Sequence, residues 1–139
     1  MAETSSFPPQ SFDALVIGAG LAGLAVALGL KRAGLNAACI GRPERAGPGR
    51  TVALLGQSLD ILDGLGVLGE VESRGAAMRT LRMVDDTGSL FANRPVDFRA
   101  SEIGRDVFGW NIENSALAPV LEAALGEAPR FEAEVVGFD

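Results

Sequence analysis

The sequence predicts an α/β fold in which a parallel sheet forms around an N-terminal strand–helix–strand unit. Two short apolar runs, 12–17 and 36–40, flank a longer apolar segment, 21–33. A glycine-rich stretch joins the first run to that segment. Units of this kind place their two strands in parallel, because the connecting helix crosses over the sheet. The chain has 139 residues, of which 47% are hydrophobic, so one domain with a packed core is expected.

Each element of the N-terminal unit has its own signal in the sequence. Phe12–Ile17 is a short apolar run that ends at Gly18, which is typical of a buried strand. Leu21–Ala33 is apolar on every side, as expected for a helix packed between layers. Gly34 follows at the position where glycine commonly ends a helix. Asn36–Ile40 completes the unit as a second buried strand.

The rest of the chain predicts shorter elements around an inserted β-hairpin. The motif Asp85-Asp86-Thr87-Gly88 is a turn signal between two runs of strand-forming residues. The last strand, Phe131–Phe138, is expected to join the first two in the parallel sheet. The predicted strands are Thr51–Leu54, Met78–Val84, Ser89–Phe91, Val96–Arg99 and Phe108–Ile112, and the predicted helices are Ser58–Leu65, a short one near Glu70, and Ser115–Leu125.

Composition excludes several classes of function. Twelve Lys and Arg against eighteen Asp and Glu give a net charge of -6, which is unfavourable for nucleic-acid binding. The chain has no His, so a His-based triad, a His general base and a His metal site are excluded within it. Cys39 is the single cysteine and is expected to be a small buried residue. No metal site is predicted.

The uncharged segment Ala14–Leu30 is not expected to be a signal or a membrane span. Acidic Glu3 and Asp13 precede it, whereas a secretory signal has a basic region there. Four glycines interrupt its 17 residues, and a membrane helix needs about 20 apolar residues. Residues 1–11 are predicted to form a disordered leader.

The glycine-rich stretch is the candidate ligand-binding motif of the chain. Gly18-Ala19-Gly20-Leu21-Ala22-Gly23 has the spacing GxGxxG, follows a predicted strand and opens a predicted helix. In a Rossmann-like unit the first glycine permits the tight turn, the second admits a pyrophosphate to the backbone, and the third allows close packing of helix and strand. The helix N-terminus then offers N–H donors to the phosphates. The alternative is a tight strand–helix turn that binds nothing.

A dinucleotide-binding unit usually carries an acid at the end of its second strand, where it binds a ribose hydroxyl. Here Gly41 stands at that position. Glu44, three residues further on, is the candidate for this role, and a solvated loop charge is the equal alternative.

Two later segments add a family resemblance. The two segments are Arg50-Thr51-Val52-Ala53-Leu54 and Gly109-Trp110-Asn111-Ile112-Glu113-Asn114-Ser115-Ala116-Leu117. The resemblance rests on these segments and on the GAGLAGL stretch. From Phe12 to its last residue the chain resembles class A flavoprotein monooxygenases of the para-hydroxybenzoate hydroxylase fold. Within that group it is most similar to the ubiquinone-biosynthesis hydroxylases.

The resemblance implies roles for three further residues. Arg50 stands where the family has an arginine near the FAD phosphates, and Arg42 where it often has a basic residue beside the adenosine. Asn114 stands where the family has an amide that contacts the cofactor. A solvated surface charge is the alternative for each arginine. Asn114 has the alternative role of capping the helix that starts at Ser115.

The function implied by the resemblance is hydroxylation of an aromatic ring, with FAD as cofactor and NAD(P)H as its reductant. The cofactor carries the chemistry, so no residue of the chain is assigned as catalytic. The partner implied is an aromatic small molecule, in the cytoplasm, with peripheral membrane association of the full enzyme left open. The alternatives are another FAD- or NAD(P)-dependent oxidoreductase, such as an amine oxidase-like or geranylgeranyl reductase-like enzyme, and a non-catalytic nucleotide-binding fragment.

The resemblance also implies that the fold is incomplete at the C-terminus. The family's later Asp-Gly and Gly-Asp motifs are not found in the 139 residues. Residues 12–139 are therefore expected to be the N-terminal part of an FAD-binding domain, with 76–108 as the start of a substrate-binding sheet. The isolated chain is expected to be incomplete and inactive.

Overall fold

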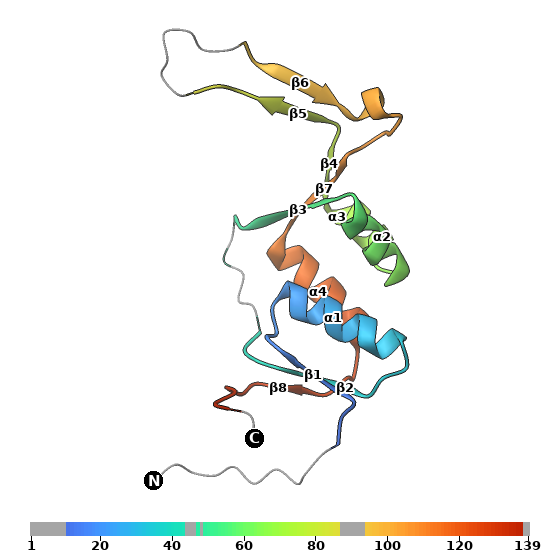
Figure 1. Ribbon diagram of the computed structural model, residues 1–139, viewed down its shortest axis with the longest axis vertical. Coiled ribbons are helices and arrows are strands. Elements are labelled where there is room, and N and C mark those ends of the chain that lie inside the picture. The colour runs from blue at the N-terminus through green and yellow to red at the C-terminus, as the bar shows by residue number, and fades with distance from the viewer. Residues whose placement is uncertain (1–10, 44–46, 48, 87–93, 138–139) are drawn as a thin grey trace. The chain divides into compact units, whose positions relative to one another are not determined.

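The computed structural model describes residues 11–43, 47, 49–86 and 94–137 (Figure 1). The chain divides into two compact units. The first unit combines Met1–Glu44 with Leu121–Asp139, and the second is Arg45–Val120. The leader predicted over residues 1–11 lies outside the described residues except for Ser11.

The first unit contains the predicted parallel sheet. Strands β1 (Ala14–Ile17), β2 (Ala37–Ile40) and β8 (Arg130–Phe131) lie in the order β1-β2-β8. Both pairings are parallel, with Ala14 opposite Ala37 and Cys39 opposite Arg130. This confirms the prediction that the first, second and last strands form one parallel sheet.

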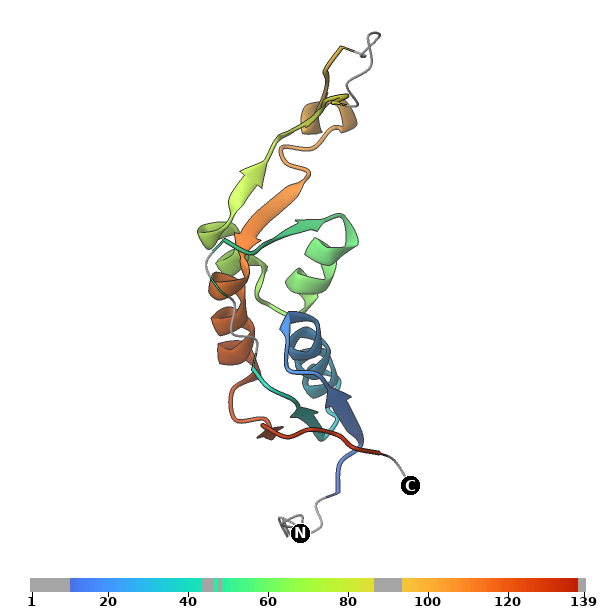
Figure 2. The ribbon, with the colours of Figure 1, turned by 90° about the vertical axis from the view of Figure 1, so that its left-hand side faces the viewer.

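Helix α1 (Leu21–Arg32) connects β1 to β2 and lies on one face of this sheet, as Figures 1 and 2 show. Its buried residues are Leu24, Ala27 and Leu28, which recur at helical spacing and form the core with β2. The helix ends before Gly34, which has a φ of +82°. Glycine adopts that conformation without the steric cost that a Cβ atom would add, which explains the sharp end of the helix.

Strand β8 is shorter than the predicted Phe131–Phe138. The N–H of Ala133 donates a hydrogen bond to the carbonyl oxygen of Phe131 at 3.0 Å, so the chain bends immediately after the strand. The same carbonyl oxygen accepts the N–H of Gly41 at 2.9 Å. The alternation seen in the sequence therefore continues beyond the paired segment, and Phe138 lies outside the described residues.

The second unit contains an antiparallel sheet in the order β3-β7-β4. Its strands are β3 (Thr51–Leu55), β7 (Gly109–Glu113) and β4 (Ala76–Met78), and its helices α2 (Gln57–Gly64) and α3 (Leu68–Arg74) follow β3. Helix α4 (Asn114–Leu125) begins directly after β7, one residue earlier than predicted. Leu62, Val71 and Ile112 are among the buried residues of this unit.

The inserted hairpin consists of β5 (Thr80–Met83) and β6 (Val96–Arg99), followed by a 3-10 helix at Ala100–Ile103. The sequence prediction placed the hairpin partner at Ser89–Phe91, whereas among the described residues β5 pairs with β6, and Met83 lies opposite Val96. Ser89–Phe91 lies outside the described residues. The single predicted strand Met78–Val84 is also divided, since β4 pairs with β7 whereas β5 pairs with β6.

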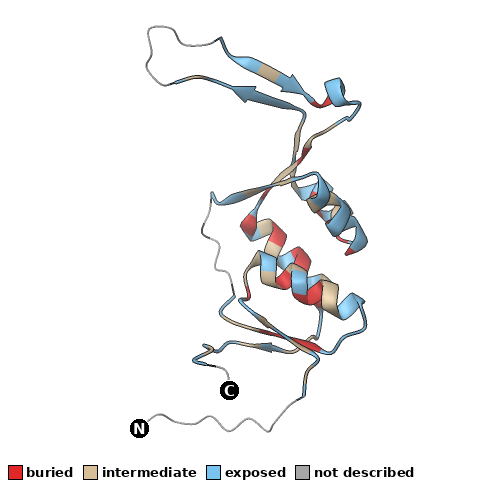
Figure 3. Cartoon of the chain, viewed as in Figure 1, coloured by how far each residue is buried: buried red, intermediate tan, exposed pale blue. Residues whose placement is uncertain are grey.

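The two faces of the hairpin differ in chemistry. The cross-strand pairs Leu81–Phe98 and Met83–Val96 place four apolar side chains on one face. The pairs Thr80–Arg99 and Arg82–Asp97 occupy the other face. Figure 3 shows both strands largely exposed. None of the described helices combines the length and apolar character that crossing a membrane requires.

Candidate cofactor site

The strand–helix turn has the close packing that its glycines predict. Gly18 follows β1 with a φ of +113°, in the region that favours glycine. Its N–H donates to the carbonyl oxygen of Ile40 at 2.7 Å, which ties the turn to the end of β2. A Cβ atom at Gly23 would overlap the Gly18 carbonyl oxygen and lie 2.9 Å from the Gly18 carbonyl carbon. Helix and strand therefore approach as closely as glycine at position 23 allows.

Helix α1 begins at the middle of the motif. Gly20 is its N-cap residue, with φ -77° and ψ -178°, and has no side chain to occupy the space in front of the helix. The first intrahelical hydrogen bond runs from the N–H of Leu24 to the Gly20 carbonyl oxygen at 2.9 Å. N–H groups of the first turn of a helix point toward its N-terminus, where they and the helix dipole favour an anion. Ala19, Leu21 and Ala22 complete the motif at this end.

A hollow of about 480 Å³ opens where the strands of the first unit end. The carboxyl ends of β1 and β2 contribute to it, as does the segment that follows β8, which is the edge of a parallel sheet where ligands usually bind. The lining residues are Ile17, Gly18, Ile40, Gly41, Arg42, Ala133, Glu134 and Val135.

Two of these lining residues bear charge. Arg42 is one of the predicted site residues, and the structure places it in the hollow with the first glycine of the turn. Glu134 was not predicted, because the sequence suggests only an alternating strand there. The signal that points to it is topological: β8 is parallel to β2 and adjacent to it, so residues that follow β8 lie at the same edge as those that follow β2.

Gly41 occupies the position where an acid was expected. Its φ is +148°, and a Cβ atom there would lie 2.9 Å from the Ala19 backbone nitrogen. The backbone of the turn thus leaves no room for a side chain at the end of β2. Glu44, the alternative acid, lies outside the described residues.

Arg50 and Asn114 come together in the second unit, whereas the glycine turn and Arg42 belong to the first. Arg50 immediately precedes β3, and its carbonyl oxygen accepts the N–H of Asn114 at 2.9 Å. Asn114 is buried and is the first residue of α4, whereas Arg50 is exposed. The antiparallel pairing of β3 with β7 sets this contact, since Thr51 lies opposite Glu113.

Cys39 is a buried core residue next to the Gly18–Gly23 turn, and its burial was predicted. Its Sγ is 3.5 Å from the carbonyl oxygen of Gly18, and burial raises the pKa of its thiol, an effect that the charge of Arg130 partly offsets. In the part of the chain that the structure describes, no group of three or more His, Cys, Asp or Glu side chains could hold a metal ion.

Comparison with known proteins gives one family. Residues 11–135 match the family model described as FAD binding domain. No curated protein matches the chain.

Solved structures share the fold. The chain superposes on the tetracycline destructase Tet(51) with a TM-score of 0.57 and 25% identity, covering 86% of this chain and 29% of that one. PqsL from Pseudomonas aeruginosa, described as a probable FAD-dependent monooxygenase, gives a TM-score of 0.68 at 22% identity, over 92% of this chain and 35% of that one. The p-nitrophenol 4-monooxygenase PnpA from Pseudomonas putida DLL-E4 gives 0.65 at 20% identity, over 86% and 31%. The chain thus spans about a third of the length of these proteins.

Proposed function

Because this chain belongs to the family of FAD binding domains, we propose that it binds the adenosine and pyrophosphate of FAD within a flavin-dependent monooxygenase that hydroxylates an aromatic ring. The observation that carries the proposal is the turn from Gly18 to Gly23. It stands at the carboxyl end of β1, opens helix α1 and borders a hollow of about 480 Å³. A backbone turn of this kind suits a pyrophosphate, which accepts hydrogen bonds from main-chain N–H groups.

Each charged residue of the hollow has a role in this proposal. Arg42 holds the adenosine side of the cofactor through the hydrogen-bond donors of its guanidinium. Glu134 accepts hydrogen bonds from the ribose hydroxyls, the task that an acid after β2 performs in many dinucleotide-binding domains. Its place in the hollow supports this role, since Gly41 has no room for an acid.

Arg50 and Asn114 act together in the proposal. The main-chain hydrogen bond between them fixes the start of β3 to the start of α4, so the two side chains are presented from one rigid junction. Arg50 binds phosphate oxygens, because a guanidinium forms two parallel hydrogen bonds with such groups. Asn114 contacts the cofactor through its amide.

Bound FAD, reduced by NAD(P)H, supplies the oxygen-transfer chemistry, and the protein supplies binding and orientation. The substrate class rests on the resemblance of the Arg50–Leu54 and Gly109–Leu117 segments to aromatic hydroxylases. The name of the similar p-nitrophenol 4-monooxygenase, which refers to an aromatic compound, supports it.

We further propose that the ring belongs to a precursor of ubiquinone. The support is the likeness of the segment from Gly109 to Leu117 to the hydroxylases of that pathway. Such precursors carry long apolar tails, so the enzyme would work in the cytoplasm at the surface of the membrane. Loss of ring hydroxylation on deletion of the gene, with accumulation of the unhydroxylated quinone precursor, tests this assignment.

Titration of the cofactor-free intact enzyme with FAD, followed by the anisotropy of flavin fluorescence, tests the cofactor role, because the isolated chain of 139 residues is expected to bind FAD weakly or not at all. Gly20→Val places a branched side chain before the helix, and the backbone angles at Gly20 are ones that valine tolerates. Gly69→Val is the matched control, because a Cβ atom at Gly69 meets nothing within 4 Å. We expect saturable binding by the wild type and the control, and at least about tenfold weaker binding by Gly20→Val. Equal binding by all three forms, or binding by none, would overturn the role of the turn.

Hydroxylation is tested separately in the holoenzyme. Transfer of labelled oxygen from O₂ into an aromatic product is the expected result. FAD-dependent oxidation of a substrate without oxygen incorporation would favour the oxidoreductase alternatives instead.

A further inference from the structure

A second hollow, of about 570 Å³, lies in the second unit at the base of the hairpin. Three arginines and two hydroxyl side chains contribute to its lining, together with one carboxylate. The lining residues are Arg79, Thr80, Arg99, Ser101, Arg105 and Asp106. A cluster of this kind is unusual in a chain whose net charge is -6.

Main-chain hydrogen bonds gather the three arginines from separate segments. Arg79 lies between β4 and β5, and its carbonyl oxygen accepts the N–H of Ala100 at 2.9 Å. The carbonyl oxygen of Ala100 in turn accepts the N–H of Arg105 at 3.0 Å. Gly104, with a φ of +71°, turns the chain back so that Arg105 returns to this point. Arg99 enters from β6 opposite Thr80. Main-chain hydrogen bonds and strand pairing therefore hold the backbones of the three arginines near one another.

Among the described residues, carboxylates balance only part of the positive charge of the hollow, since the charge of Arg99 also interacts with Asp97. Within the described residues, no ion pair of 4.0 Å or less joins Arg79, Arg99 or Arg105 to a carboxylate. Asp97, the acid within β6, accepts two hydrogen bonds from Arg82, of 2.6 and 2.8 Å. Asp106 is the one acid of the lining, so the hollow carries an excess of two positive charges.

We propose that this hollow binds a small molecule through a phosphate or pyrophosphate group. Three guanidinium groups close together repel one another, and a multiply charged anion relieves that repulsion while accepting paired hydrogen bonds. The hydroxyls of Thr80 and Ser101 add donors that a phosphate, with its several oxygens, can use. The volume exceeds that of a phosphate group and falls within the usual size of a small-molecule site, about 300 to 1,000 Å³. The site is distinct from the glycine turn, which lies in the other unit.

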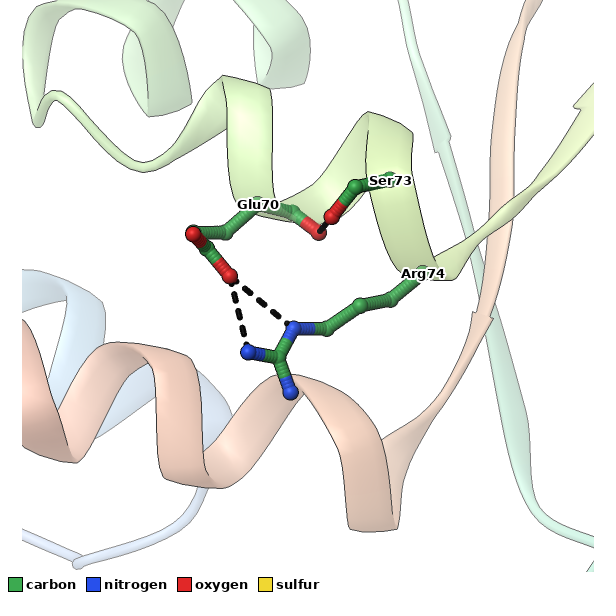
Figure 4. Close-up of polar contacts among 3 residues, drawn as sticks. All are labelled: Glu70, Ser73 and Arg74. Atoms are coloured by element: carbon green, nitrogen blue, oxygen red, sulfur yellow. Dashed lines mark hydrogen bonds and ion pairs between the residues drawn. The ribbon is translucent and has the colours of Figure 1, made fainter.

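Arg74 supplies a matched control for charge removal. Its guanidinium already donates two hydrogen bonds to a carboxylate oxygen of Glu70, from Nε at 3.0 Å and from Nη2 at 2.8 Å, while Ser73 bonds to the Glu70 carbonyl (Figure 4). Arg74→Ala removes the same charge from an exposed side chain of the same unit, outside the hollow. Substitution of exposed side chains usually changes stability little, by about 0.5 kcal/mol or less, so these variants are expected to fold.

Calorimetric titration of the full chain with inorganic pyrophosphate tests the proposal. We expect saturable binding by the wild type and Arg74→Ala, and about tenfold weaker binding by Arg79→Ala and by Arg105→Ala. Arg105→Lys keeps the charge but loses the paired hydrogen bonds, so its affinity should fall between those of the wild type and Arg105→Ala. Circular dichroism of each variant is the control for folding.

Repeating the titration in the Gly20→Val background separates this site from the cofactor turn. The arginine-dependent binding should persist there, so failure of one proposal is distinguishable from failure of the other. Competition by NADPH but not by NADH would identify the 2′-phosphate of the reductant as the natural ligand, and competition by inorganic phosphate alone would indicate a free phosphate. Equal affinity in all arginine variants, binding lost only with Gly20→Val, or no binding at all would overturn the proposal.

Discussion

A Cβ atom on Gly23 would project into the carbonyl oxygen of Gly18, so the second residue of this pair must be glycine for the turn to keep its geometry. The carbonyl belongs to the backbone of the strand–helix turn and cannot rotate away as a side chain would. The Gly18 N–H is also bonded to Ile40, which fixes the turn from the other side. The packing of the turn and the cofactor geometry proposed for it thus depend on the same contact.

Gly23→Ala is therefore expected to lower the free energy of unfolding by about 1 to 3 kcal/mol, the usual cost of overpacking. Gly69→Ala is the control, because its added methyl group meets open space in helix α3. That variant should gain about 0.5 to 1 kcal/mol from helix propensity. Urea denaturation followed by circular dichroism measures both, and unchanged stability of Gly23→Ala would contradict the close approach.

Glu134→Gln should weaken FAD binding, because a charged acceptor at the ribose hydroxyls becomes a neutral one. The expected loss is about tenfold, corresponding to a hydrogen bond to a charged group. Glu127→Gln removes an equal charge from an exposed residue that does not line the hollow and should bind like the wild type. Flavin anisotropy measures both. If the two variants bind equally, the acid that replaces the one missing after β2 is not Glu134.

The thiol of Cys39 is expected to react slowly with iodoacetamide, and only at a pH above the ordinary thiol range. Burial raises its pKa in the folded chain, so the neutral thiol is favoured there. The neutral Cys39 thiol therefore contributes to the free energy of unfolding. This contribution is fully present below the thiol pKa of the unfolded chain and is lost as the pH rises through the thiol pKa of the folded chain. Comparing alkylation rates in the presence and absence of urea at several pH values measures the effect. Cys39→Ala should show less loss of stability at alkaline pH than the wild type.

The Asp97 carboxyl should stay ionised to a lower pH than an ordinary aspartate. Hydrogen bonds from Arg82 lower its pKa, with further contributions from the charges of Arg82 and Arg99. Its contribution to hairpin stability is present above the unfolded pKa and disappears as the pH falls through the folded one. Carboxyl NMR titration should show the pKa rising in Arg82→Ala. Since the pair is exposed, the global stability of the chain should change little.

The N-terminal unit was predictable because its signals are local. Apolar runs, the glycine turn and Gly34 each report on their own neighbourhood, and the structure has β1, α1 and β2 within two residues of the predicted bounds. The parallel addition of β8 also followed, because a crossover connection constrains strand direction.

The features that the sequence did not predict depend on contacts between residues far apart in the chain. The hairpin turn signal at Asp85–Gly88 suggested an adjacent partner, whereas the actual partner, β6, is chosen by the match of apolar residues such as Phe98 with Leu81 across the strands. The end of β8 depends on a bend stabilised by the Phe131 carbonyl, which no alternation of residue types reveals. Glu134 and the arginine hollow needed the sheet order and the main-chain bonds around Ala100, and neither is encoded as a sequence motif.

The position of β8 also sets an order of events during synthesis. The first unit is closed by residues from Leu121 onward, while all of Arg45–Val120 emerges from the ribosome before them. The inserted unit holds its own sheet and can form its contacts as soon as β7 appears. Strand β2 can pair with β1 early, but its second partner, β8, follows the whole inserted unit. Pairings of such wide sequence separation are slow, because the intervening chain must first be closed into a loop. The glycine turn therefore belongs to a unit in which the pairing of β2 with β8 can form only after the inserted unit has been made.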